Sequence, residues 1–403
     1  MCYIESTISN IIDPTLYVIW NQGINQLKLK PFKLERYFAK YEFSAPYLLC
    51  CSDCESFSIG EILNFENGTE ESLLSLCLGY TESQGSPELR DQIALLYNGI
   101  SSENVLVHAG AEEAIFNFMN VTLNADDHVI VHSPHYQSLG DIARSLGAHV
   151  TEWQGDSEKD WQLDLNFLED SLTERTKMLV VNFPHNPTGY LPDKDFLADL
   201  SVLSKKYGFI VFSDEVYRFL EYREADRLPA FCELDERAVS LGVMSKSFGL
   251  AGLRIGWVVT RNNDIYREMA LFKDYTTICN SAPSEYLATV ALRNREPILT
   301  RNLEIIRKNL KSLNVFFSKH SDLFQWSPPK AGPIACPRYL GGSVDEFCHR
   351  LVTNKGVLLL PGSLYHEKYD FFRIGFGRKD MMKSLKKLEE FIEDSRNLGM
   401  NTD

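Results

Sequence analysis

The feature that most constrains the fold is an alternation of short, apolar, β-rich runs with helical patterns between about residues 100 and 260. Strands that are apolar throughout are typical of a parallel sheet covered by helices on both faces. We therefore expect an α/β fold with a mainly parallel, seven-stranded sheet. The runs are 105–107, 129–131, 149–151, 178–181, 209–212, 238–241 and 256–260.

The pattern changes after about residue 280. Long amphipathic segments (285–293, 300–318, 344–355 and 379–396) there surround short strand-like runs near 356–360 and 372–375. This change predicts a second, smaller α+β domain. We place the large domain at 46–280 and the small domain at 281–403, and we expect residues 1–45 to pack with the small domain. A chain of 403 residues is long enough for two such units.

Composition excludes several classes of partner. The chain has 41 Lys and Arg against 55 Asp and Glu, a net charge of −14, which argues against binding to nucleic acid or to an anionic membrane surface. No apolar run approaches the roughly 18 residues that span a bilayer. The first residues carry an acid where a secretory signal carries bases. Nine scattered cysteines suit a reducing compartment, so we expect a cytoplasmic protein.

Cys51 and Cys54 have the CxxC spacing of metal and redox motifs. A zinc site needs a second pair, which does not follow, and the flanking residues do not resemble a thioredoxin-like helix start. We interpret these residues as incidental thiols and expect no metal site.

A lysine in a glycine-rich run provides the first sign of chemistry. Lys246 follows a predicted strand, and Arg254 lies eight residues further on. Alone, such a lysine is usually a surface residue. The run precedes a strand, whereas a dinucleotide-binding loop follows one and opens a helix. A lysine here could instead form an imine with an aldehyde cofactor and then move protons. Arg254 could hold a phosphate with its planar donors.

Other polar residues follow the ends of predicted strands, where ligands of open α/β sheets bind. Asp214 could keep a pyridine nitrogen protonated, or simply cap the next helix. Asn186 lies in an Asn-Pro-Thr-Gly turn and could donate to a phenolic oxygen. Residues 110–114 open a helix whose amide groups could bind phosphate. Tyr136 could stack on a planar ring, although a buried tyrosine is ordinarily part of a core.

The order of these motifs, from about residue 75 to 378, resembles the class I/II aminotransferase family of fold-type I pyridoxal-phosphate (PLP) enzymes. Seven ordered motifs of this kind are very unlikely to arise by chance. The matching motifs are Tyr80 with Gly85 and Leu89-Arg90, Gly110–Ala114, Pro134–Tyr136, Asn186–Gly189, Asp214–Tyr217, Ser245-Lys246 with Arg254, and Phe372–Gly375.

The resemblance implies a PLP cofactor and a set of catalytic residues. Lys246 would carry the internal aldimine and later move the proton between the substrate Cα and the cofactor C4′. Asp214 would pair with the pyridinium, while Asn186 and Tyr217 would bind the 3-oxygen of the ring. Tyr136 would stack on the ring.

The resemblance also implies binding residues for phosphate and substrate. Arg373 would clamp the α-carboxylate of an amino-acid substrate, and Asn186 would also bind the substrate. Tyr80 would reach the phosphate of a neighbouring subunit, which makes a homodimer the expected state. The residues expected around the phosphate within one chain are Ala111, Glu112, Ser245 and Arg254.

Two departures from the family pattern concern the phosphate and the substrate. Val243 occupies a position where many relatives carry Ser or Thr in contact with the phosphate. The stretch 50–56 lacks the glycine-proline turn that shapes the substrate site in many relatives. Substrate specificity therefore should not be copied from the common aspartate or aromatic transaminases.

Three functions are compatible with these motifs. The first is an aminotransferase acting on an L-amino acid. The second is a PLP-dependent cyclase, lyase, oxidase or hydroxylase acting on arginine or hydroxyarginine, because residues 81–85, 110–116 and 181–186 look similar to the capreomycidine-synthase-like branch. In that case Asp53 and Glu55 could bind a guanidinium, or they are simply solvated acids. The third, a non-catalytic ligand sensor, is disfavoured by the acidic chain and by the lack of a DNA-binding extension before the motif region.

Overall fold

The computed structural model describes residues 29–397, so the first 28 residues of the predicted N-terminal segment lie outside the described part. A seven-stranded sheet forms its centre, in the order β2-β8-β7-β6-β5-β3-β4. Only β8 runs antiparallel to its neighbours, which confirms the mainly parallel sheet. The strands are β2 (Val105–His108), β3 (His128–Ser133), β4 (His149–Gln154), β5 (Thr176–Asn182), β6 (Ile210–Asp214), β7 (Val239–Val243) and β8 (Gly256–Thr260).

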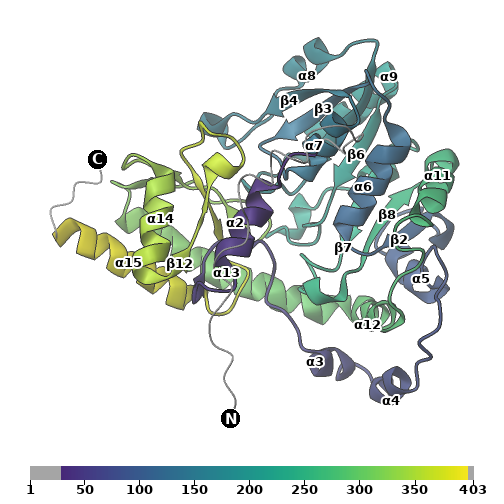
Figure 1. Ribbon diagram of the computed structural model, residues 1–403, viewed down its shortest axis with the longest axis horizontal. Coiled ribbons are helices and arrows are strands. Elements are labelled where there is room, and N and C mark those ends of the chain that lie inside the picture. Colours follow the sequence, from purple (N-terminus) through teal and green to yellow (C-terminus); the bar gives the residue numbers. More distant parts are fainter. Residues whose placement is uncertain (1–28, 398–403) are drawn as a thin grey trace, which may run out of the picture.

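Helices cover both faces of this sheet (Figure 1). Neighbouring residues of one strand point to opposite faces and enter different cores: Val180 packs in the core under α6, while Leu179 and Val181 pack in the core under α9. Strands buried on both faces need apolar residues at every position, which explains the continuous apolar runs. The helices are α5 (Pro87–Ala94), α6 (Ala111–Thr122), α7 (Ser138–Ser145), α8 (Leu165–Ser171), α9 (Lys194–Tyr207), α10 (Phe231–Leu234), α11 (Asn263–Lys273) and α12 (Ala282–Arg293).

The C-terminal part begins with the long helix α13, which passes along one side of the molecule (Figure 1). Its small strands form an antiparallel sheet in the order β10-β14-β13 and a separate pair, β9 with β11. The elements are α13 (Arg295–Lys319), β9 (Phe324–Gln325), β10 (Ile334–Ala335), β11 (Arg338–Tyr339), α14 (Val344–Lys355), β12 (Val357–Leu358), β13 (Leu360–Pro361), β14 (Phe372–Gly375) and α15 (Met381–Asn397).

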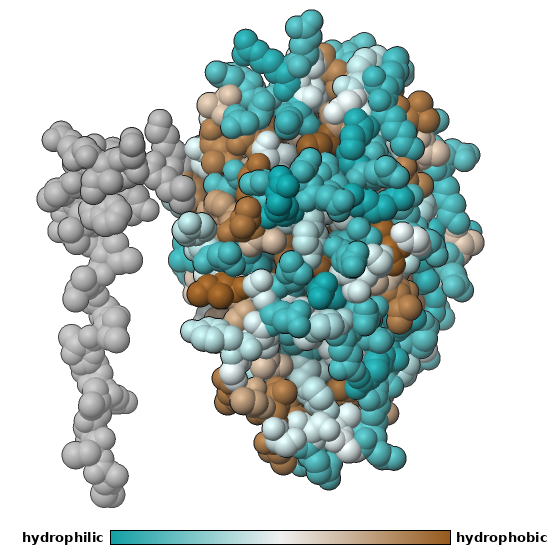
Figure 2. Space-filling model, turned by 90° about the vertical axis from the view of Figure 1, so that its right-hand side faces the viewer, coloured by the Kyte–Doolittle hydropathy of each residue, from teal (hydrophilic) through white to brown (hydrophobic). Residues whose placement is uncertain are grey.

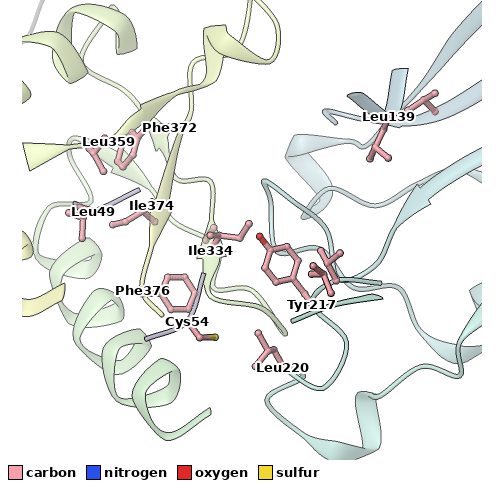
Figure 3. Close-up of a cluster of buried hydrophobic side chains, with 14 of the residues drawn as sticks. Leu49, Cys54, Leu139, Tyr217, Leu220, Ile334, Leu359, Phe372, Ile374 and Phe376 are labelled. Carbon is pink, nitrogen blue, oxygen red and sulfur yellow. The ribbon is translucent and has the colours of Figure 1, made fainter. Parts of the chain in front are cut away.

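One apolar core continues from the C-terminal part into the large sheet. Figure 3 shows Phe372, Ile374 and Phe376 on one side, Ile334 between, and Tyr217 and Leu220 on the other side. Burial of such side chains contributes about 1.5–3 kcal/mol each, so this cluster fixes the two parts against each other.

The N-terminal elements contact both the large sheet and the C-terminal part. Helix α2 (Lys33–Tyr41) lies between the large sheet and the C-terminal part (Figure 1). The Gln137 amide at the start of α7 donates to the Pro31 carbonyl, and the Tyr37 hydroxyl donates to the Leu359 carbonyl. After α2 in the chain, β1 (Tyr47–Leu48) pairs in parallel with β12 of the C-terminal part. Helices α3 (Ile59–Leu63) and α4 (Thr69–Leu74) follow β1 in the chain. No helix within residues 29–397 is long and apolar enough to cross a membrane.

Candidate active site

A cavity of about 500 Å³ opens at the carboxyl ends of the central parallel strands, closed on one side by α2. Polar side chains that follow different strands converge there because all these strand ends lie at one edge of the sheet. Ten of the predicted site residues line the cavity: Ala111, Glu112, Tyr136, Asn186, Asp214, Tyr217, Ser245, Lys246, Arg254 and Arg373.

Lys246 follows β7 and directs its amine into the cavity. Its Nζ donates to Ser52 Oγ at 2.9 Å. Burial lowers the pKa of this amine from its ordinary value, because a charged ammonium is poorly solvated there. A lysine that can lose its proton in this way is suited to attack a carbonyl carbon and to act as a base.

Asp214 ends β6 and is buried beside the same space. The Val216 amide donates to its Oδ1 at 3.2 Å, and burial raises the pKa of the carboxyl to about 7. A buried carboxylate favours an adjacent cation, because that cation compensates for lost solvation. This position is suited to a protonated ring nitrogen.

The start of α6 and Arg254 form a second, anion-binding end of the cavity. Gly110 precedes the helix with φ of +92°, and a Cβ there would lie 2.5 Å from the Arg254 Nη2. Glycine at residue 110 therefore suits this backbone conformation and leaves room for the guanidinium where it lies. Helix amide groups and a guanidinium together suit a phosphate. Val243 lines the cavity nearby, so this position supplies no hydroxyl group.

Glu112 is an acid at this same end of the cavity. Its Oε2 accepts from Ser138 Oγ at 3.0 Å, and burial raises the pKa of the carboxyl to about 7. A carboxyl group that is protonated more readily than usual repels a nearby phosphate less.

Arg373 on β14 is buried and fixed from several sides. Its Nε and Nη2 donate to the Cys50 carbonyl at 3.1 and 2.9 Å, and its Nη1 donates to Asn186 Oδ1 and to the Tyr365 hydroxyl, both at 3.1 Å. Because the Asn186 oxygen accepts from Arg373, its amide nitrogen remains as the donor that faces a ligand. The Tyr217 hydroxyl donates to the Ser52 carbonyl at 3.0 Å.

Tyr136 joins the cavity to α2. Its hydroxyl donates to Glu35 Oε1 at 2.7 Å, and its ring lies 4.9 Å from that of Phe32. The aromatic face expected to stack on a planar ligand is thus held by the N-terminal segment.

Tyr80 lies apart from this group. Its side chain is 91% exposed and does not line the cavity of its own chain. The structure therefore brings together the predicted residues of one chain but leaves Tyr80 facing outward.

The two acids considered for substrate binding differ in position. Asp53 lines the cavity and accepts from Arg378 Nε and Nη2 at 3.1 and 2.9 Å. Glu55 accepts from the Lys379 backbone amide and does not line the cavity. Asp53 is therefore paired within the protein rather than solvated.

Four polar lining residues did not emerge as site residues from the sequence: Ser52, Glu35, Glu42 and Arg378. The spacing of Glu35 and Glu42, seven residues or two helical turns, was the only signal that they share a helix face. Nothing in the sequence indicates that this face covers the sheet edge.

These features fit PLP. The cavity combines an amine that can bind its aldehyde, a buried acid for its ring nitrogen, an amide donor for its 3-oxygen and an anion-binding helix start for its phosphate. The aldehyde would be held by Lys246 and the ring nitrogen by Asp214. The 3-oxygen would be held by Asn186 and the phosphate by Arg254.

Comparisons with known proteins identify relatives of this fold and site. The model of the class I and II aminotransferase family matches residues 66–387. Capreomycidine synthase from Streptomyces vinaceus is 29% identical over 376 residues, 92% of this chain and 94% of that protein. The structure of a PLP-dependent aminotransferase from Streptococcus suis 89-1591 matches with a TM-score of 0.86 and 31% identity, over 91% of this chain and 98% of that one. The structure of the PLP-dependent cyclase OrfR matches with a TM-score of 0.85 and 27% identity, over 93% and 99%.

Proposed function

Because the chain belongs to the class I and II aminotransferase family and is a PLP-dependent enzyme, we propose that it transfers the amino group of an L-amino acid. The observation that carries this proposal is the convergence of Lys246, Asp214 and Arg373 on one cavity. Transamination requires these three side chains: a base at the substrate Cα, an anion at the ring nitrogen and a cation for the α-carboxylate.

When bound, PLP supplies an electron-withdrawing ring that stabilises negative charge at the substrate Cα. Asp214 keeps the ring nitrogen protonated and so strengthens this effect. Arg373 binds the α-carboxylate through its Nη atoms and orients the substrate. Burial lowers the pKa of the Lys246 amine, which favours its role as a base: it would take the proton from Cα and return it at the cofactor carbon C4′.

A second candidate is a cyclase or lyase, or an oxidase or hydroxylase, acting on arginine or hydroxyarginine. Similarity to capreomycidine synthase and to OrfR favours it, because both cover more than nine-tenths of this chain. The same lysine, aspartate and arginine serve all these reactions, so the product depends on the steps after the Cα proton has been removed.

Two measurements test the proposal. Borohydride treatment of the yellow holoprotein should bleach it and leave the cofactor on the Lys246 peptide, as found by mass spectrometry, and Lys246→Ala should abolish this attachment. Under air and without keto acid, the best amino acid of a panel should convert the cofactor once to its amine form, and an added keto acid should restore it. Repeated turnover without keto acid, with loss of oxygen or a cyclic product, would favour the second candidate. A colourless protein without affinity for PLP would overturn both.

We also propose that the enzyme works as a homodimer in which Tyr80 completes the site of the partner subunit. The segment around Tyr80 lies beside residues 273–280, since Thr81 donates to the Asn280 carbonyl and Lys273 to the Ser83 carbonyl. Large apolar side chains are exposed there, a feature typical of contact surfaces. They are Leu74, Leu78, Tyr80, Tyr275 and Ile278. Figure 2 views the molecule from the side of α5 and α11, where apolar patches lie among polar side chains.

A further inference from the structure

One wall of the active-site cavity carries two carboxylates that the proposed chemistry does not use. Glu35 lies in the first turn of α2, and Glu42 is the residue directly after this helix. Both line the cavity. These two acids form one wall of the substrate site. Their negative charge is opposite to that of the arginines that line the same cavity.

Each arginine that lines the cavity is either assigned to an anionic group of the cofactor or substrate or paired within the protein. Arg254 is assigned to the phosphate and Arg373 to the α-carboxylate. Arg378 is held by both oxygens of Asp53, a bidentate ion pair, and is therefore not free to bind a second carboxylate. A dicarboxylic substrate would find no unpaired cation among the described residues that line the cavity.

The acidic side chains that line the cavity are not all paired or assigned in this way. Asp214 is assigned to the ring nitrogen and Asp53 is paired with Arg378. Within the described part of the chain, the Glu35 carboxylate accepts a single hydrogen bond, from the neutral Tyr136 hydroxyl. For Glu42, no hydrogen bond or ion pair of the carboxylate is found within residues 29–397. Within residues 29–397, these two carboxylates thus face the substrate space without a direct ion pair.

Burial makes this arrangement costly unless a ligand compensates for it. The Glu42 side chain is half-buried, and burial raises the pKa of its carboxyl, opposed by the nearby Arg378. A carboxylate that has lost solvent gains most from a cation that makes direct hydrogen bonds.

We propose that Glu42, together with Glu35, binds a cationic group at the end of the substrate side chain. The enzyme then selects α-amino acids that end in a guanidinium or an ammonium group, and discriminates against those that end in a carboxylate. This inference rests on the proposed function, because the cofactor must bind the α-amino group and Arg373 the α-carboxylate for the side chain to reach this wall.

The test compares L-arginine with L-citrulline, which has nearly the same shape but no charge. Binding to the PLP-loaded enzyme is followed by titration of the visible spectrum, so that the readout is a dissociation constant rather than turnover. Charge-assisted hydrogen bonds to a half-buried carboxylate predict that arginine binds at least tenfold more tightly than citrulline. L-Lysine should bind more tightly than L-norleucine, and L-aspartate should bind weakly.

Matched variants assign this preference to the wall. Glu42→Gln keeps the size of the side chain and should bring the ratio of the two dissociation constants close to one, with a smaller decrease for Glu35→Gln. Glu174→Gln, the same change at an exposed acid that does not line the cavity, should keep the wild-type ratio.

The outcomes separate this inference from the proposed function. A spectrum that responds equally to arginine and citrulline, or best to aspartate, would overturn the inference while the proposed function stands. The inference would also be overturned if both Glu42→Gln and Glu35→Gln kept the wild-type ratio of the arginine and citrulline dissociation constants. A spectrum that responds to no amino acid would overturn the proposed function, and the inference with it.

Discussion

At the scale of single residues, Ser52 is the contact that holds the reactive lysine. Its hydroxyl accepts from Lys246 Nζ, and its carbonyl accepts from Tyr217. We expect Ser52→Ala to lower kcat about fivefold, because one hydrogen bond of roughly 1 kcal/mol that orients the amine is lost. KM for the amino acid should change less than twofold, since Ser52 is not assigned to substrate binding. A steady-state comparison of kcat and KM with those of the wild type measures both, and a change confined to KM would contradict this role.

Asp214 makes the stability of the apoprotein depend on pH. Burial raises the pKa of its carboxyl from 3.8 to about 7 in the folded protein. Between these values the folded protein holds a proton that the unfolded chain has lost, so the free energy of unfolding falls as pH rises. Relative to Asp214→Asn, the wild-type apoprotein should lose up to roughly 4 kcal/mol between pH 4 and pH 7. Urea unfolding of both proteins across this range measures the difference, and parallel curves would show that Asp214 does not titrate in this way.

Sequence patterns could predict those residues whose role depends on the sheet alone. Asp214, Asn186 and Lys246 follow strands of a parallel sheet, and the ends of parallel strands meet at one edge. Ser52 and Glu42 reach the same place from a segment far away in the chain. Their position depends on the packing of α2 and of residues 49–54 against the C-terminal part, and no local periodicity encodes such packing.

At the scale of elements, the contact between β14 and residues 49–54 places one wall of the site. The Gly375 amide donates to the Leu49 carbonyl, and a Cβ on Gly375 would lie 1.9 Å from the Cys51 carbonyl oxygen. Because the obstructing atom belongs to the backbone, Gly375→Ala should push β14 and residues 49–54 apart. We expect the free energy of unfolding to fall by about 3 kcal/mol, the upper part of the usual range for overpacking, with weaker binding of PLP.

Gly60 in α3 provides the matched control for this substitution. A Cβ there meets no atom within 4 Å. Gly60→Ala should therefore leave stability unchanged or raise it by roughly 0.5–1 kcal/mol, as expected for alanine within a helix. Denaturant unfolding of both variants measures the two changes in the free energy of unfolding. Equal changes would mean that the close approach of β14 to residues 49–54 is not the reason why residue 375 must be glycine.

The elements also differ in how far the sequence could predict them. The seven strands of the large sheet were predictable from their apolar runs, and helices α12 to α15 from their amphipathic periodicity. The two-residue strands β9, β10 and β11 were not, because a strand of this length has no detectable period. β10 pairs with β14 at Ala335 and Ile374, and such pairings exist only after the chain has packed.

At the scale of the whole molecule, the active site lies where three regions of the chain meet. The large sheet supplies Lys246 and Asp214, β14 supplies Arg373, and residues 32–54 supply Glu42 and Ser52. A shift of one region relative to the others would change the shape of the cavity. The residues that bind the cofactor can therefore stay the same while the residues that contact the substrate side chain differ.

The exposed surface around Tyr80 leads to a prediction about assembly. If Tyr80 completes the partner's site, a charge at the neighbouring Leu78, which is 79% exposed, should weaken the dimer. We expect Leu78→Glu to raise the dimer dissociation constant about a hundredfold, the effect of roughly 3 kcal/mol from burying an unpaired acid. Sedimentation velocity measures this constant, and equilibrium dialysis measures a parallel loss of affinity for PLP. Val315→Glu, at a residue of α13 that is 72% exposed, is the control and should change neither quantity. A monomeric wild type that binds PLP fully would contradict a site shared between subunits.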